Sequence, residues 1–313
     1  MKACLAIGSA PAVTFLAVVM FAWSYVGQTV PACAGSMTFE YVVSSDCVYQ
    51  QPHNTALSPD GRYLYVPEVR RHRIVVLDAA SLAYVNEFGR GDLQWPHDVS
   101  IGPDNQLYVA DSGNDRIAIF DLDGTTATFK SQLKGDFENP EGVFAHPNGR
   151  VFVSGEDSGS VVVFENQTAL NTIKGLNRPH GIGLADDGGV WVAMAGNNKL
   201  LNYDAELRPT GREVNEPLAG PRYMALSADD HIFLAEKQGH TIAVLSASGE
   251  VVARLGSGAP GFGRGVFNGP EGIAVRDGSI WVTDTSNGRI VRYRVHKTEN
   301  KLATGSLLRP STH

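Results

Sequence analysis

The chain has 313 residues, of which 43% are hydrophobic, and its 26 basic and 33 acidic residues give a formal net charge of −7. This composition predicts a folded chain with a large core, and an all-β chain of this length forms a single domain. The acidic charge leaves no basic surface for phosphate backbones, which excludes nucleic acid and anionic membranes as expected partners.

Residues 1–34 predict a signal peptide that takes no part in the fold. An apolar run from residue 10 to residue 26 precedes Ala32-Cys33-Ala34, a small-residue pattern that signal peptidase recognises. Because the apolar run is long, an uncleaved membrane anchor is the alternative. Cleavage leaves 25 basic against 33 acidic residues, a net charge of −8, and predicts a secreted or periplasmic protein.

The same cleavage removes two of the three cysteines and leaves Cys47. A single cysteine cannot form an internal disulfide, so the fold is expected to be stable without one. Cys47 is therefore expected to be a small core residue, with an intermolecular or reactive role as the alternative.

Six segments of the remaining chain repeat one pattern: a proline, a variable residue, a short apolar strand, a polar turn, a second strand and a third. The six variable residues lie 44, 44, 39, 42 and 49 positions apart, a spacing typical of four-stranded propeller blades. The runs LYVP, LYVA, VFVS, VWVA, IFLA and IWVT are rich in β-branched and aromatic residues. The repeat predicts an all-β, six-bladed β-propeller over residues 35–298.

A ring of blades closes only if its first and last blades are joined. The segment 39–43 is apolar and aromatic, and we expect it to add an outer strand to the last blade by pairing with residues 289–295. Residues 299–313 predict a polar C-terminal tail, and the propeller is expected to be a monomer.

The residues after the six prolines are the main candidates for chemistry, because each opens the innermost strand of a blade and they meet at one mouth of the central channel. All six are ionisable. They are His53, His97, Glu141, His180, Arg222 and Glu271.

Blades two, four and six lie about 120° apart in a six-fold ring and contribute His97, His180 and Glu271. Two imidazoles and a carboxylate are typical ligands of zinc and related divalent metals, so we predict that these residues bind the metal. The other three blades contribute His53, Glu141 and Arg222, with Tyr223 beside the arginine. These four residues are the catalytic candidates, since a base, an acid and an anion-binding group suit metal-assisted proton transfer or hydrolysis.

The segments ADSGNDRI and GPEGIAV resemble NHL repeats, which implies a six-bladed propeller over essentially all of residues 35–298. NHL propellers include enzymes, binding modules and scaffolds, so the resemblance alone assigns no function.

The ring also looks like that of peptidyl-α-hydroxyglycine α-amidating lyases, a family that holds zinc with three histidines from alternate blades. RPHGIGL around His180 and WPHDVSI around His97 match two of the family's histidine contexts. The third position holds Glu271 in this chain. The family also uses an arginine and a tyrosine from the loops between second and third strands, and the loops EVRRHR, EDSGS and GNNKL contain no such pair. The resemblance thus implies the metal position more than the reaction.

Two functions from different classes remain open. The first is an exported metal-dependent lyase or hydrolase acting on a small molecule or a peptide end. Zinc is its expected metal, with calcium as the alternative that lactonase-type propellers place among oxygen ligands. The second is a non-catalytic propeller that binds a ligand or a protein partner.

Other conspicuous residues are expected to be structural. Asp111 with Arg116, and Asp284 with Arg289, occupy matching turns of two blades and are expected to form ion pairs. The loop histidines His72 and His240 are expected to be solvated. The tryptophans Trp95, Trp191 and Trp281 are expected to pack in the core or between blades.

Overall fold

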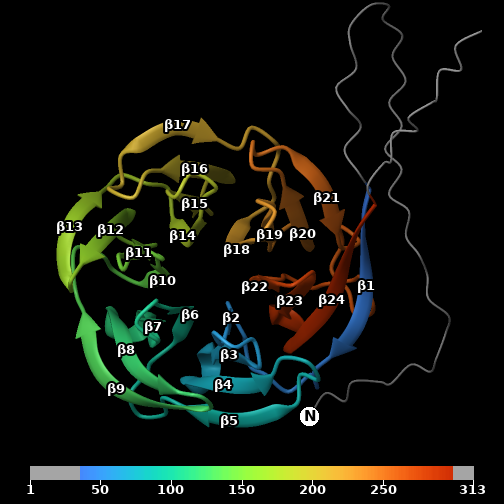
Figure 1. Cartoon of the computed structure of the whole chain (residues 1–313), viewed down its shortest axis with the longest axis horizontal. Coiled ribbons are helices and arrows are strands. Elements are labelled where there is room, and N and C mark those ends of the chain that lie inside the picture. The colour runs from blue at the N-terminus through green and yellow to red at the C-terminus, as the bar shows by residue number, and fades with distance from the viewer. Residues whose placement is uncertain (1–35, 299–313) are drawn as a thin grey trace, which may run out of the picture.

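A computed structural model describes residues 36–298, which form six four-stranded antiparallel sheets arranged in a ring (Figure 1). The predicted all-β, six-bladed propeller is confirmed. The predicted signal peptide and C-terminal tail lie outside the described residues. Among residues 36–298, no helix is long and apolar enough to cross a bilayer.

In every blade the first strand of the repeat lies nearest the axis and the later strands follow outward (Figure 1). The first three blades are β2 (Ala56–Leu57), β3 (Tyr63–Glu68), β4 (Arg73–Asp78) and β5 (Tyr84–Phe88); β6 (Pro96–Ile101), β7 (Gln106–Asp111), β8 (Arg116–Asp123) and β9 (Thr126–Leu133); and β10 (Pro140–Ala145), β11 (Val151–Gly155), β12 (Ser160–Glu165) and β13 (Thr168–Ile173). Blades four and five are β14 (Pro179–Leu184), β15 (Val190–Met194), β16 (Lys199–Tyr203) and β17 (Pro209–Glu213); and β18 (Pro221–Leu226), β19 (Ile232–Glu236), β20 (Thr241–Leu245) and β21 (Val251–Leu255). Blade six is β22 (Ile273–Arg276), β23 (Ser279–Asp284), β24 (Arg289–Thr298) and β1 (Ser36–Ser44). Three short 3₁₀ turns follow second strands: η1 (Val69–Arg71), η2 (Ser112–Asn114) and η3 (Thr285–Asn287).

The ring is closed by the first strand of the chain, as the sequence predicts. Strand β1 pairs antiparallel with β24, and Phe39 lies opposite Val295. The side chains of Met37, Phe39 and Tyr41 pack against the hydrophobic cluster between blades five and six. Since β1 and β24 share one sheet, neither strand can leave without opening the ring.

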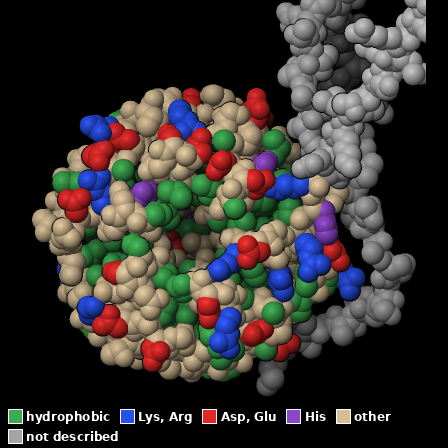
Figure 2. Space-filling view, viewed as in Figure 1, with side chains coloured by type: hydrophobic (Ala, Val, Ile, Leu, Met, Phe, Trp, Pro, Cys, Tyr) green, Lys and Arg blue, Asp and Glu red, His purple; other side chains and the backbone are tan. Residues whose placement is uncertain are grey.

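The hydrophobic core lies between neighbouring blades, where the faces of successive sheets pack together. Trp191 is buried, and Trp281 of blade six donates its indole N–H to the carbonyl of Ala79 in blade one at 2.7 Å. The packing prediction is wrong for Trp95, which is 51% exposed. Figure 2 shows one face of the ring, where hydrophobic side chains border a central hollow and charged side chains spread around it.

The two predicted ion pairs in matching turns are confirmed. Asp111 meets Arg116 at 2.7 Å and Asp284 meets Arg289 at 2.8 Å. Each carboxylate also accepts a backbone N–H from the segment that leads into its own blade. These acids therefore fasten the loop at the entrance of a blade to the end of its second strand.

Cys47 differs from its expected role as a lone core residue. It is half-buried and disulfide-bonded, and its partner lies outside the described residues.

Deletion of residues 36–44 is predicted to lower the free energy of unfolding of the whole ring, because it removes the outer strand of blade six and uncovers apolar surface. Urea denaturation followed by circular dichroism measures the effect. The control is Val42→Ala, which changes a residue at the bulge in β1 that is 37% exposed. An unchanged urea midpoint after the deletion would contradict this closure.

Asp284→Ala is predicted to cost about 3–5 kcal/mol of stability, because Arg289 would keep a buried charge without its partner. The matched control is Asp121→Ala, which breaks an exposed pair with Lys130 and should cost at most about 1 kcal/mol. Chemical denaturation of both variants tests the difference. Equal losses would show that burial does not decide the contribution of the pair.

Candidate functional site

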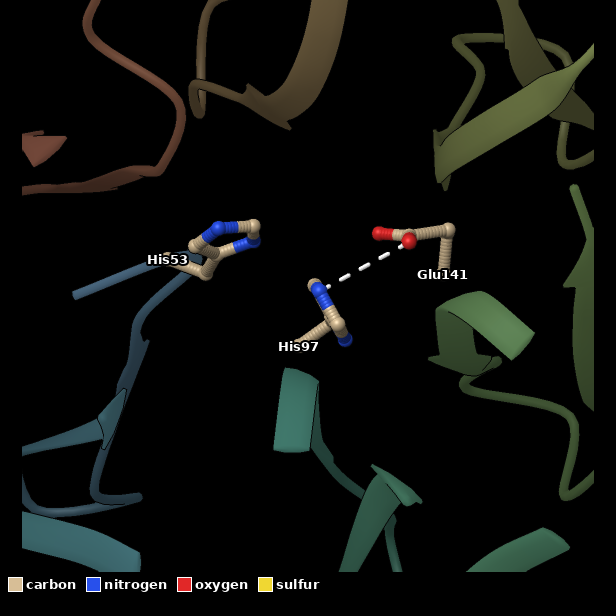
Figure 3. A group of neighbouring side chains, drawn as sticks. All are labelled: His53, His97 and Glu141. Carbon is tan, nitrogen blue, oxygen red and sulfur yellow. Dashed lines mark ion pairs between the residues drawn. The ribbon is translucent and has the colours of Figure 1, made fainter. Parts of the chain in front are cut away.

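The six predicted residues meet at one mouth of the channel, because each stands where the chain enters the innermost strand of its blade. His97, Glu141, His180 and Arg222 are the second residues of β6, β10, β14 and β18, while His53 and Glu271 lie just before β2 and β22. Figure 3 shows His53, His97 and Glu141 pointing from neighbouring blades toward one another. Five of the six are less than 9% exposed, and His97 is half-buried.

Glycines after three of these residues allow the inner strands to approach closely. A Cβ on Gly142 would lie 2.3 Å from the carbonyl oxygen of His180, and one on Gly181 would lie 2.4 Å from that of Arg222. Both distances are too short for real atoms, so the Pro-Glu-Gly and Pro-His-Gly sequences serve packing as well as chemistry.

Two carboxylates organise the ring into two halves. Glu141 lies between two imidazoles, with 3.6 Å to His97 Nε2 and 3.3 Å to His180 Nε2. Glu271 instead faces His53 Nε2 at 3.6 Å and Arg222 Nε at 3.8 Å, and the ammonium group of Lys237 lies 2.8 Å away. Every ion pair between two of the six ionisable residues joins neighbouring blades.

The three imidazoles are neutral at ordinary pH. Burial lowers the pKa of His53 and His97 to about 3, and nearby positive charges add to the effect for His53. Burial, followed by the charge of Arg222, lowers the pKa of His180 well below its usual value. Neutral imidazoles are the form that binds metal ions.

The hydrogen bonds of His97 fix which of its nitrogens carries the proton. Its Nδ1 lies 2.9 Å from the carbonyl oxygen of Trp95, which can only accept, and 2.7 Å from the hydroxyl oxygen of Ser112. The hydroxyl of Ser112 donates to the carbonyl of Pro140 at 2.5 Å, so its oxygen is free to accept from Nδ1. In a neutral ring Nε2 is then a lone-pair donor, and it faces Glu141.

Two lone-pair atoms cannot face each other favourably, so the pair of His97 and Glu141 requires a proton or a cation between them. Burial raises the pKa of Glu141 well above its usual value, and the charges of Glu156 and Glu271 raise it further. A protonated Glu141 satisfies one imidazole at a time, whereas a metal ion satisfies several ligands at once.

The arrangement of donors fits a divalent metal. Within residues 36–298, the ligand atoms of His53, His97 and Glu141 all lie within 4.8 Å of one another. Two ligands of a tetrahedral zinc ion are about 3.4 Å apart, close to the 3.6 Å between His97 and Glu141. In this part of the chain, the buried Nδ1 of His53 also lacks a hydrogen-bond partner.

This trio differs from the predicted ligands His97, His180 and Glu271. His97 belongs to both sets, and His180 contacts the same carboxylate as His97. Glu271 is paired instead with His53, Arg222 and Lys237.

The remaining catalytic candidate, Tyr223, is buried beside His180. It is 1% exposed, and its hydroxyl crosses from blade five to donate to the backbone carbonyl of Glu141 in blade three at 2.7 Å. Its ring contacts that of His180, with centroids 4.8 Å apart. Tyr223 therefore links the inner strands of blades three and five.

Asp98 connects the first three blades at the points where they carry His53, His97 and Glu141. Its carboxylate accepts the side-chain amide of Asn54 at 2.6 Å and the backbone N–H groups of Val99 and Val143 at 2.7 and 2.9 Å. Asn54 follows His53 directly, and Asp98 follows His97. One fully buried carboxylate thus fixes the relative positions of blades one, two and three at the mouth.

Sequence reasoning missed Lys237, Glu156 and Ser112, which follow the second strands of their blades. The sequence carried a signal for them, because the loops after the second strands open at the same mouth and these three residues are polar or charged. The loop histidines differ from their expected solvated state. His72 accepts the backbone N–H of Trp95, and His240 accepts that of Gly269, both at 3.0 Å, so each links its blade to the next.

Comparison with known proteins agrees with this architecture. Residues 93–120 and 267–293 match the NHL repeat, and the chain carries NHL repeats on a six-bladed propeller. No curated protein sequence matches the chain.

Similar solved structures include an auxiliary nutrient binding protein from Bacteroides thetaiotaomicron, with a TM-score of 0.64 and 18% identity over 85% of this chain and 77% of that one. A catalytically inactive virginiamycin B lyase from Staphylococcus aureus with quinupristin gives 0.59 and 16% over 86% and 90%. A gluconolactonase from Xanthomonas campestris gives 0.61 and 11% over 87% and 99%. These likenesses concern the fold.

Asp98→Asn is predicted to cost about 1–3 kcal/mol of stability, because an amide N–H₂ would replace an oxygen that accepts a buried N–H. The matched control is Asp123→Asn at the exposed end of β8, which should change stability by less than about 0.5 kcal/mol. Urea denaturation of the two variants makes the comparison. If Asp98→Asn is as stable as the wild type, the carboxylate does not hold the three strands.

Proposed function

We propose that this protein is an exported metal-dependent enzyme, a lyase or hydrolase, whose active site is the ionisable mouth of the propeller. The observation that carries the proposal is the pairing of the His97 Nε2 lone pair with the buried carboxylate of Glu141. The presence of two enzymes among the similar propellers supports it. The exported location rests on residues 1–34 alone.

The proposed ligands are His53, His97 and Glu141, because their donor atoms are mutually close. A divalent ion held there would supply a Lewis acid that polarises an oxygen of the substrate. Imidazole nitrogen favours zinc among the candidate metals, since calcium prefers six to eight oxygen ligands. Ser112 and the carbonyl of Trp95 orient His97 for this role, as outer partners of metal-bound histidines do.

The other ionisable residues at the mouth are then available for proton transfer and for binding the substrate. His180 is the remaining imidazole of the mouth, and its Nε2 lies 3.3 Å from Glu141. Because burial lowers its pKa, it is a weak base, and it would accept only a proton that a bound metal had made more acidic. Arg222 is buried, and its Nε lacks a hydrogen-bond partner among residues 36–298, which suits it to hold an anionic group. Compared with the sequence hypothesis, His53 and His180 exchange the roles of base and ligand, and Glu141 replaces Glu271 as the carboxylate ligand.

A second candidate function follows from the proton that Glu141 can hold. If Glu141 is protonated, it can donate to one of its imidazole partners, and the mouth needs no metal. The propeller would then be a binding module, which the similarity to a nutrient binding protein supports. Metal content separates the two candidates.

Elemental analysis of freshly purified protein is predicted to find one divalent metal, zinc, per chain. Ser112→Ala should lower metal affinity about 10–100-fold by freeing His97, and Glu141→Ala should lower it further by removing a ligand. His296→Ala is the control, because His296 is exposed and pairs with Glu40 on the outer strands of blade six. Wild-type protein without stoichiometric metal would favour the binding module.

A further inference from the structure

An exposed tryptophan stands on one side of the mouth. Trp95 immediately precedes Pro96 and His97, and it is 51% exposed. Its backbone is held on both sides, because its N–H donates to His72 and its carbonyl accepts from His97. The indole thus has a fixed base, and its ring centroid lies 6.3 Å from that of His72.

The backbone conformation at this position belongs to the repeat and does not select a tryptophan. Trp95 has a φ of 51°, and the equivalent residues before the prolines of the other blades are also left-handed: Gln51, Asn139, Arg178, Gly220 and Gly269. Trp95 is 51% exposed, so its side chain adds little to the core. The indole therefore leaves apolar surface open to a ligand beside the mouth.

The other side of the mouth carries an excess of positive charge. Arg222 and Lys237 both face Glu271, so two cations share one carboxylate. The Nε of Arg222 has no hydrogen-bond partner, and the side chain of Arg222 is 10% exposed. Lys237 is 38% exposed and reaches the mouth from the solvent side. This half of the mouth can therefore accept an anion.

The two features lie opposite each other. Trp95 belongs to blade two and Lys237 to blade five, and blades three apart in a six-membered ring face each other across the axis (Figure 1). Glu141 and His180 belong to the two blades between them. A ligand that spans from blade two to blade five would pass over the ring.

We propose that the mouth binds a small carboxylate that carries an aromatic or apolar group, with the ring of the ligand on Trp95 and its carboxylate at Lys237 and Arg222. This inference deepens the proposed function and rests on the mouth being its ligand site. Stacking on Trp95 would hold the apolar end of the ligand, and charge-assisted hydrogen bonds from Lys237 and Arg222 to its carboxylate would set its orientation.

Calorimetric titration with 3-phenylpropionate, 3-phenylpropionamide and propionate tests the proposal. The aromatic acid is expected to bind saturably, and the amide and the small acid are each expected to bind at least tenfold more weakly. The amide lacks the charge, and propionate lacks the ring. Equal affinity for acid and amide, or no saturable binding of any probe, would overturn the proposal.

Two variants test which residue binds each end of the ligand. Lys237→Met should lower the affinity for 3-phenylpropionate at least tenfold and leave that for the amide unchanged, which also shows that the mouth is intact. Trp95→Ala should lower affinity for 3-phenylpropionate three- to tenfold without changing that for propionate.

The matched controls are Lys130→Met and Tyr84→Ala, which remove an exposed lysine and an exposed aromatic side chain from outer strands. Both should bind the probes as the wild type does. If the controls lose as much affinity as the mouth variants, the proposal fails. Metal content measured on the same samples separates this outcome from failure of the proposed function, since a metal-free protein that binds the acid keeps the ligand assignment and loses the metal.

Discussion

A buried carboxylate that faces two imidazole nitrogens governs this site. Glu141 lies within 3.6 Å of Nε2 of both His97 and His180. Burial keeps the imidazoles neutral and favours the protonated form of the carboxylic acid. The arrangement is therefore stable only with a positive charge among these atoms, either a proton or a metal ion. That choice decides between the binding module and the enzyme.

The fold brings this group together by repetition. Each blade supplies one side chain at the entrance of its innermost strand, and closure of the ring by β1 and β24 sets their spacing. Asp98 links the entrances of the three blades that carry the proposed ligands, while Tyr223 donates to the backbone carbonyl of Glu141. The stability of the propeller and the geometry of the mouth thus depend on the same inner strands.

The sequence was sufficient to predict the number of blades, the closing strand and the six residues at the mouth, because all three follow from a repeat with regular spacing. It was not sufficient to predict which of the six residues are neighbours in contact. The sequence hypothesis grouped residues from alternate blades, which lie about 120° apart. In a channel this narrow, however, side chains from adjacent blades come into contact first. The rings of His53 and His97, for example, have centroids 4.5 Å apart. The packing prediction for Trp95 was wrong for a different reason, because it was made from residue type alone. The equivalent residues of the other blades are Gln51, Asn139, Arg178, Gly220 and Gly269, none of them hydrophobic, so the repeat itself indicated an exposed position.

Anomalous X-ray scattering from crystals of the native protein, recorded on both sides of the zinc absorption edge, tests the central claim most directly. Our account predicts one peak at the mouth, within coordination distance of His97 Nε2 and a carboxylate oxygen of Glu141. A mouth without a peak, in which a Glu141 oxygen lies at hydrogen-bond distance from an imidazole nitrogen, would show that a proton occupies the position we assign to the metal.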